Sequence, residues 1–173
     1  MDVRDRNNLD QPLFPVSVAA VAAKVPPNTI RSWFQREQVT LQNSDAKASA
    51  NGLPHLLTLR SVLALAATAE LVRQGVKPKE AYAAACEWIY IIDEDQGLER
   101  PDAGLYPDHY TVLISSPYGQ QTKIVPVPMK GDEKPTINLF DIFGVRRHGA
   151  RLIWLDYIHH DAIMVCEGHL RDA

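Results

Sequence analysis

Residues 16–37 run VSVAAVAAKVPPNTIRSWFQRE, two apolar-patterned segments that flank a pair of prolines. In the first segment Ser17 precedes valines and alanines at helical spacing, and serine is a favoured N-cap residue. The helix must end near Val25, because proline lacks a backbone N–H and restricts the residue before it. We therefore predict a first short helix that begins after Ser17 and ends before the prolines.

The second segment is expected to form another short helix, over residues 29–37. Asn28 precedes it and can cap its N-terminus through the side-chain oxygen. Three apolar residues recur at i, i+3 and i+4, which places them on one inward face. They are Ile30, Trp33 and Phe34. The polar residues of the same helix are left on its outer face.

Between residues 38 and 57 the helical pattern disappears. Residues 42–52 are polar and small, and they predict a loop. The short apolar pieces that flank it, 39–41 and 53–57, favour two strands joined by a long tip, which is the form of a wing. A disordered linker is the alternative, and the apolar flanks argue against it.

Two further helices are predicted after this loop. Thr58 can cap a helix that runs to about Gln74, and Gly75 stands at the C′ position that favours glycine. Pro78 suits the first turn of a fourth helix, which we extend to about Ile92.

Beyond residue 92 the sequence changes character. Residues 93–104 are acidic and contain glycine and proline, which predicts a linker. The later segments have the β-branched, alternating composition of strands. We expect strands at 110–115, 122–128, 151–158 and 162–166, and a strand or a short helix at 137–143. The prolines of the second of these suit only an edge strand.

The predicted fold class is therefore α+β, with two domains. An N-terminal all-α winged helix-turn-helix domain occupies residues 14–92, preceded by a flexible arm over residues 1–13. After the acidic linker, residues 105–173 form a small β-rich C-terminal domain for oligomerisation or effector binding.

Charge is divided unevenly along the chain. Residues 12–80 hold eight basic and four acidic side chains, an excess of +4, whereas residues from 91 onward hold eight basic and thirteen acidic ones, an excess of −5. The first half suits a phosphate backbone and the second half would avoid it. The alternative is that the charges of two ordinary protein surfaces are divided in this way by chance.

The exposed side chains of the second helix suit DNA recognition. In a helix-turn-helix unit this helix lies in the major groove, where arginine pairs with guanine, asparagine and glutamine with adenine, and serine and threonine contact phosphate. Basic residues of the wing and at the N-terminus of the fourth helix can hold the backbone. The candidate DNA-binding residues are Ser17, Asn28, Thr29, Arg31, Ser32, Gln35, Arg36, Lys47, His55, Lys77 and Lys79.

The segment from Val16 to Trp33 resembles the opening of mercury-resistance-regulator-like (MerR-like) proteins. That family begins with a short helix, a turn and a second helix that carries Thr-Leu-Arg followed by aromatic residues. Thr29-Ile30-Arg31 and Trp33 match this pattern, and a wing and a helix pair follow in the same order. The sequence departs from the family in the wing, which lacks its arginine and tyrosine, and after residue 92, where we expect no long helix.

The resemblance implies a homodimer, or a higher homo-oligomer, that contacts two half-sites of double-stranded DNA. We expect a bacterial or phage transcription regulator that is cytoplasmic and associated with the nucleoid. The C-terminal domain could also bind a protein partner. An excisionase-like or architectural DNA-binding factor is the first alternative, and a protein–protein adaptor that uses the same helical fold is the second.

Membrane proteins, enzymes and metalloproteins are disfavoured. No stretch approaches the roughly 18 apolar residues of a membrane span, and the N-terminus lacks the apolar core of a signal peptide. The motifs of nucleotide hydrolases, serine hydrolases, zinc proteases and kinases are absent, so we expect no enzymatic activity and no cofactor.

Histidines near the C-terminus raise the question of a zinc site. His159, His160 and Asp161 lie near Cys166 and His169, but their spacing is not that of a structural zinc site, and adjacent histidines of a strand would point to opposite faces. We therefore expect no metal. The two cysteines, Cys86 and Cys166, are far apart and favour a reducing compartment over a disulfide framework.

Overall fold

The computed structural model describes residues 9–46, 55–95, 98–116, 121–129 and 149–172. In these residues the chain is a mixed α and β protein, with helices mostly in the N-terminal half, strands in the middle and a helix at the end. The helices are α1 (Val16–Ala22), α2 (Pro27–Gln35), α3 (Leu59–Arg73), α4 (Pro78–Tyr90) and α6 (Leu155–Asp172). The strands are β1 (Phe14–Pro15), β2 (Leu56–Leu57), β3 (Asp93–Asp95), β4 (Leu98–Arg100), β5 (His109–Ser115), β6 (Thr122–Pro128) and β7 (Arg151–Trp154).

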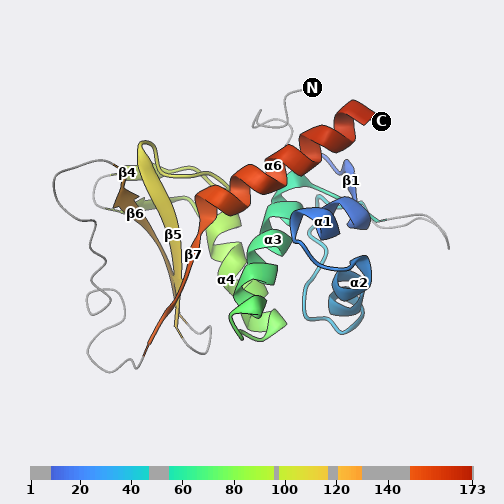
Figure 1. Cartoon of the computed structure of the whole chain (residues 1–173), viewed down its shortest axis with the longest axis horizontal. Coiled ribbons are helices and arrows are strands. Elements are labelled where there is room, and N and C mark those ends of the chain that lie inside the picture. The colour runs from blue at the N-terminus through green and yellow to red at the C-terminus, as the bar shows by residue number, and fades with distance from the viewer. Residues whose placement is uncertain (1–8, 47–54, 96–97, 117–120, 130–148, 173) are drawn as a thin grey trace.

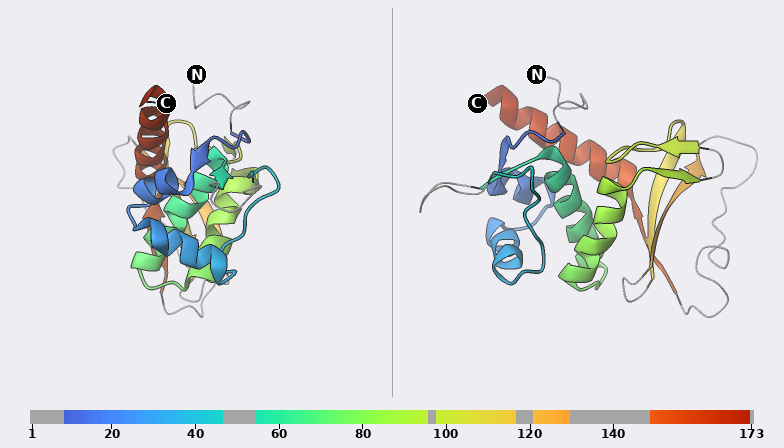
Figure 2. Two further views of the ribbon diagram at one scale, coloured as in Figure 1. Left: turned by 90° about the vertical axis from the view of Figure 1, so that its right-hand side faces the viewer. Right: turned by 180° about the vertical axis from the view of Figure 1, so that it is seen from behind.

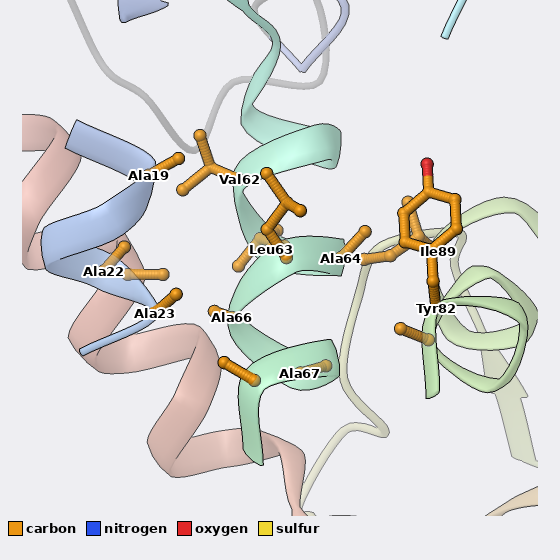
Figure 3. Close-up of a cluster of buried hydrophobic side chains, with 14 of the residues drawn as sticks. Ala19, Ala22, Ala23, Val62, Leu63, Ala64, Ala66, Ala67, Tyr82 and Ile89 are labelled. Carbon is orange, nitrogen blue, oxygen red and sulfur yellow. The ribbon is translucent and has the colours of Figure 1, made fainter. Parts of the chain in front are cut away.

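Helix α3 lies at the centre of the helical part. Figure 1 shows it between α1 on one side and α4 on the other, with α6 crossing it. Its alanines let the neighbouring helices approach closely. Figure 3 shows Ala22 of α1 and the C-cap residue Ala23 facing Ala66, while Ala64 lies toward Ile89 of α4. Both predicted signals of this helix are confirmed, because Thr58 Oγ1 accepts a hydrogen bond from Ser61 N at 3.2 Å and Gly75 follows the C-cap with φ +87°.

Three helices end in the same hydrogen-bonded motif, but only one of them uses glycine. After α3, Gly75 N donates to Val72 O and Val76 N donates to Leu71 O, which is the Schellman arrangement. The turns after α1 and α2 repeat both bonds, and their left-handed positions are occupied by Lys24 (φ 54°) and Glu37 (φ 55°). A side chain at such an angle is strained, so these two turns are held by their surroundings.

The predicted N-caps of the first two helices are wrong. Helix α1 begins at Val16 with Pro15 at the N-cap position, and Ser17 lies exposed in its first turn. Helix α2 begins at Pro27, so Asn28 is helical and Glu37 lies beyond the C-terminus. The second proline of the pair starts α2 because its fixed φ and missing N–H suit the first helical position.

The N-terminal strands pair differently from the predicted wing. Residues 39–41 form no strand; instead β2 pairs with β1 in antiparallel register, with Phe14 opposite Leu57, and Leu56 also forms a bridge with Ala46. The described end of the predicted flexible arm, residues 9–13, is tied to the fold. Leu13 N donates to Leu57 O at 3.1 Å, and Asp10 accepts from Arg60.

A three-stranded antiparallel sheet has the order β6-β5-β7. It confirms the predicted strands at 110–115 and 122–128 and the edge position of the second, whose prolines cannot donate to a further strand. The central strand is buried on both faces: Leu113 joins the main core, whereas Val112 and Ile114 form a second cluster with residues of β6. The predicted element at 137–143 lies outside the described residues.

The acidic segment predicted as a linker is a β-hairpin. Strand β3 pairs with β4, with Asp93 opposite Arg100. Arg100 is fully buried and donates to three main-chain carbonyls, those of Trp88 (2.9 Å), Ile91 (2.7 Å) and Pro101 (3.1 Å). Because Trp88 and Ile91 are at the end of α4, the guanidinium caps that helix with a favourable charge. The hairpin is thus fastened to the helical part.

The strands predicted at 151–158 and 162–166 are also wrong beyond Trp154. Residues from Leu155 to Asp172 form the 18-residue helix α6, and its buried Leu155, Ala162, Ile163 and Cys166 recur at helical spacing. This corrects the expectation that no long helix follows residue 92. Figures 1 and 2 show α6 running from the sheet back across α3 to α1, so its buried residues belong to the same core as Phe14. None of the described helices is both long and apolar enough to cross a membrane.

The left-handed turns predict that two substitutions change the free energy of unfolding in opposite directions. Gly75→Ala should lower the free energy of unfolding by about 1 kcal/mol, because a side chain at this φ is strained. The strain is the only cost, since a Cβ there would meet its nearest neighbour, Arg151 Nη2, at an ordinary 3.9 Å. Glu37→Gly should raise the same free energy by up to about 1 kcal/mol. Urea unfolding measures both, and changes of the same sign would contradict the account.

Candidate functional site

The turn between α1 and α2 sets the position of the second helix. Lys24 N donates to Val21 O and Val25 N donates to Ala20 O, both at 3.0 Å, and Pro26 then leads directly into α2. The two helices pack against each other, and α1 in turn packs on α3. The helix pair is therefore a compact unit at the edge of the core, joined by a short and fully hydrogen-bonded turn.

Helix α2 has an inner and an outer face. Ile30 is 0% and Trp33 6% exposed, which confirms the predicted inner face, and Phe34 packs partly buried against the same core. The predicted polar residues divide into two groups. Asn28, Arg31, Gln35 and Arg36 are exposed, whereas Thr29 and Ser32 are half-buried.

One hydrogen bond orders the outer face of α2. Arg31 Nη1 donates to Asn28 Oδ1 at 3.0 Å, one turn back along the helix. The bond fixes the direction of a long side chain that would otherwise lose conformational freedom on binding. The sequence-based prediction gave these two residues separate contacts with DNA. Their spacing of three residues makes them neighbours on the helix surface and could have predicted the hydrogen bond between them.

The segment after α2 is anchored to α4 through Tyr82. The phenol donates to Thr40 O at 2.9 Å and accepts from Gln42 Nε2 at 2.7 Å. Burial raises the pKa of Tyr82 well above its usual value, so the hydroxyl stays protonated and can donate. Val39, at the start of the segment, is buried in the main core.

Asp45 ties the same segment to the N-terminus of α3. Its carboxylate accepts hydrogen bonds from Gln42 N, Thr58 N and Ser61 Oγ, each at 2.8 Å, and the side chain is buried. A carboxylate at a helix N-terminus satisfies backbone donors and complements the helix dipole. Asp45 is not among the predicted site residues, because its position in a polar segment gives no sign of a partner 13 residues away.

The described part of the segment predicted as a wing ends at one bridged pair. Ala46 and Leu56 exchange two backbone hydrogen bonds, of 2.9 and 3.0 Å, and these bonds join the segment after α2 to β2. His55 is half-buried beside this pair. The candidate Lys47 lies outside the described residues, as does the tip of the loop.

The two lysines of the fourth helix are exposed at its start. Lys77 is at the N-cap position of α4, Pro78 is the first helical residue and Lys79 follows. In the views of Figures 1 and 2, this end of α4 and helix α2 both lie toward the lower end of the helical part.

Ion pairing separates the basic residues of this half into two groups. Lys24 pairs with Asp161 at 2.7 Å, Arg60 with Asp10 and Asp102, and Arg73 with Glu70. Within the described ranges, Arg31, Arg36, Lys77 and Lys79 pair with no carboxylate. The basic side chains that keep their charge available are therefore candidates for DNA contact.

The C-terminal histidines lie on a helix instead of the predicted strand. His159 packs edge-on against Trp88, with ring centres 6.4 Å apart, and His169 packs against Phe14 at 6.3 Å. In the part of the chain that the structure describes, no three His, Cys, Asp or Glu side chains are grouped so that they could hold a metal ion.

The two cysteines are free thiols. Burial raises the pKa of Cys86 to about 11 and that of Cys166 to about 12. Both are therefore protonated at neutral pH, where a catalytic nucleophile would need to be a thiolate.

Comparison of the sequence with models of protein families gave no match, and comparison with curated proteins gave none either.

The Asp45 anchor gives a second stability prediction. Asp45→Ala should lower the free energy of unfolding by about 2–3 kcal/mol, because it leaves the buried amide of Thr58 and the part-buried amide of Gln42 without their acceptor. Asn43→Ala, an exposed change in the same loop, should stay within about 0.5 kcal/mol of the wild type. Urea unfolding compares the two, and equal effects would show that Asp45 anchors nothing.

Proposed function

We propose that this chain is a sequence-specific DNA-binding protein of the MerR-like winged-helix kind and acts as a transcription regulator. Helix α2 enters the major groove, the segment that follows α2 lies on the DNA backbone or in the adjacent minor groove, and the lysines at the start of α4 contact phosphate. The observation that carries the proposal is the pairing pattern of the basic residues. In the described part of residues 12–80, the four basic residues without a carboxylate partner are Arg31, Arg36, Lys77 and Lys79, and all are on surfaces that such a protein turns toward DNA.

The rigidity of the surrounding elements supports this proposal. A base contact gives specificity only when the side chain arrives in a defined position. Ile30 and Trp33 hold α2 on the core, and the bond from Arg31 to Asn28 orients the arginine along the helix. Asp45 and Tyr82 hold the base of the wing in the same way.

Two copies of the chain are needed in this proposal. A single short helix covers only a few base pairs, and proteins of this kind obtain specificity from two half-sites about one helical turn apart. The regulator therefore acts as a homodimer on a partly symmetric site.

The direct test is DNA binding by fluorescence anisotropy at several salt concentrations. Duplexes selected from a random pool are compared with fragments from the gene's own upstream region. We expect one preferred sequence, an affinity that falls steeply with salt, and a loss of about 1–3 kcal/mol for Arg31→Ala with relaxed preference at one position. Lys79→Ala should weaken all sequences alike and reduce the salt slope by about 1.

Arg171→Ala and Lys123→Ala are the matched controls, since both residues are exposed and lie outside the proposed interface. Neither should change the preferred sequence. Equal affinity for every duplex, together with bending of the DNA, would contradict a transcription regulator and favour an architectural DNA-binding factor. Binding that does not depend on salt, or no binding, would favour a protein–protein adaptor.

The hydrogen bond on α2 gives a separate prediction about specificity. Because Asn28 orients Arg31, Asn28→Ala should lose preference at the same base position as Arg31→Ala. The double variant should lose less than the sum of the two single losses, with a coupling energy of about 0.5 kcal/mol or more. Additive losses at two different base positions would mean that Asn28 contacts its own base and does not position the arginine.

A further inference from the structure

Helix α6 has a buried side and, directly opposite, a side that is open to solvent. Figure 1 shows α6 crossing in front of α3, and the view from behind in Figure 2 shows the other helices in front of α6. On the open side, four residues recur at intervals of four, three and four, the heptad spacing of a coiled-coil seam. They are Tyr157, Asp161, Met164 and Gly168, and we call them the α6 seam.

The α6 seam carries both apolar surface and a gap. Tyr157 is 63% and Met164 45% exposed. Gly168 lies inside the helix, where glycine is unfavourable. A Cβ at Gly168 would meet no atom of the described residues within 4 Å, so the packing of this part of the chain does not require a glycine there.

A second α6 fits the seam when the two helices run antiparallel. With the two-fold axis between residues 162 and 163, Tyr157 of each copy lies opposite Gly168 of the other, so a large ring meets the gap above a glycine at both ends. Asp161 then lies opposite Met164 of the other copy. Its carboxylate is already paired with Lys24 at 2.7 Å, so its charge is balanced when the seam is covered. The surface is thus self-complementary, as a two-fold interface requires.

Charge on the flank of the seam also favours the antiparallel arrangement. The same axis places the exposed His160 of one copy opposite Glu167 of the other, and the reverse, so a histidine N–H can donate to a carboxylate on each side. A parallel pair would instead place the two Asp161 carboxylates opposite each other and leave the two glycines facing across a gap.

We propose that α6 pairs antiparallel with α6 of a second copy of this chain through the α6 seam. Because the seam belongs to a single helix, the interface is small, and we expect a dimer that dissociates in the range of about 1–100 µM. The role of this dimer in binding two half-sites rests on the proposed function, whereas the association of the two copies does not.

Sedimentation equilibrium of the whole chain, without DNA, tests the association. The mass should rise toward twice that of the chain as its concentration increases. Met164→Glu adds a carboxylate opposite Asp161 of the other copy and should raise the dissociation constant about 10-fold or more. Met129→Glu is the matched control, because Met129 is also 45% exposed but follows β6, and it should leave the constant unchanged. A single-chain mass up to about 1 mM, or equal effects of the two variants, would overturn the proposal.

Disulfide formation tests the register. A variant with both Tyr157→Cys and Gly168→Cys should form covalent dimers under mild oxidation, because each new thiol lies opposite the other kind in the second copy. Either change alone should not, since identical positions are then about 16 Å apart along the helix axis, beyond the reach of a disulfide. The wild type controls for Cys86 and Cys166. Covalent dimers of a single variant that form as fast as those of the double variant would refute the antiparallel register.

The absence of DNA from both measurements separates this proposal from the proposed function. A dimer that binds no DNA would support the interface and contradict the regulator. A monomer that binds one preferred DNA sequence would contradict the interface and support sequence-specific binding.

Discussion

The arrangement of this molecule depends on the burial of α3 on every side. Eleven of its fifteen residues are buried, including Ser61 and Thr68, so it has no face that can be left in water. Helices α1 and α4 cover two sides of it, and α6 and β7 cover a third. A helix of this composition cannot be stable until distant parts of the chain have packed against it, which makes the helical half and the C-terminal helix parts of one core.

The elements that cover α3 are themselves held in place by contacts with the β-hairpin and the residues after it. Arg100 caps α4 with hydrogen bonds to its last carbonyls, and Trp88 donates from that helix to Gly104, so the hairpin and the residues after it are fixed on the helix that covers α3. Helix α2 differs, because only Ile30 and Trp33 are buried. Its outer face has no part in the core and can carry polar residues at little cost in stability.

Local signals allowed much of the helical half to be predicted, and long-range packing explains where prediction failed. Thr58, Gly75 and Pro78 act within one turn of their own helix, so their positions are visible in the sequence. The short apolar runs at 151–158 and 162–166 predict two strands, of which only residues 151–154 form one, and the buried residues of 155–172 recur at the helical spacing of the face that packs on α1 and α3. The acidic hairpin was taken for a linker because its fixed point, Arg100, binds carbonyls of another element. For the candidate site, the inner face of α2 could be predicted from periodicity, whereas the anchor at Asp45 could not.

Pairing in the folded chain also changes the meaning of the charge pattern. Residues 12–80 have a modest excess of +4 positive charges. Three basic residues of this range form ion pairs, and two of the three pair with carboxylates outside the range. Asp161 pairs with Lys24 and Asp102 with Arg60, so acidic residues of the second half neutralise basic residues on the flanks of the first. Within the described part of residues 12–80, the cations without a carboxylate partner are those of α2, its C-cap Arg36 and the start of α4, where Glu37 and Glu80 are their acidic neighbours in sequence. In the proposed function these are the side chains that meet the DNA, and a local cluster of unpaired cations suits that role better than a uniform excess of the same size.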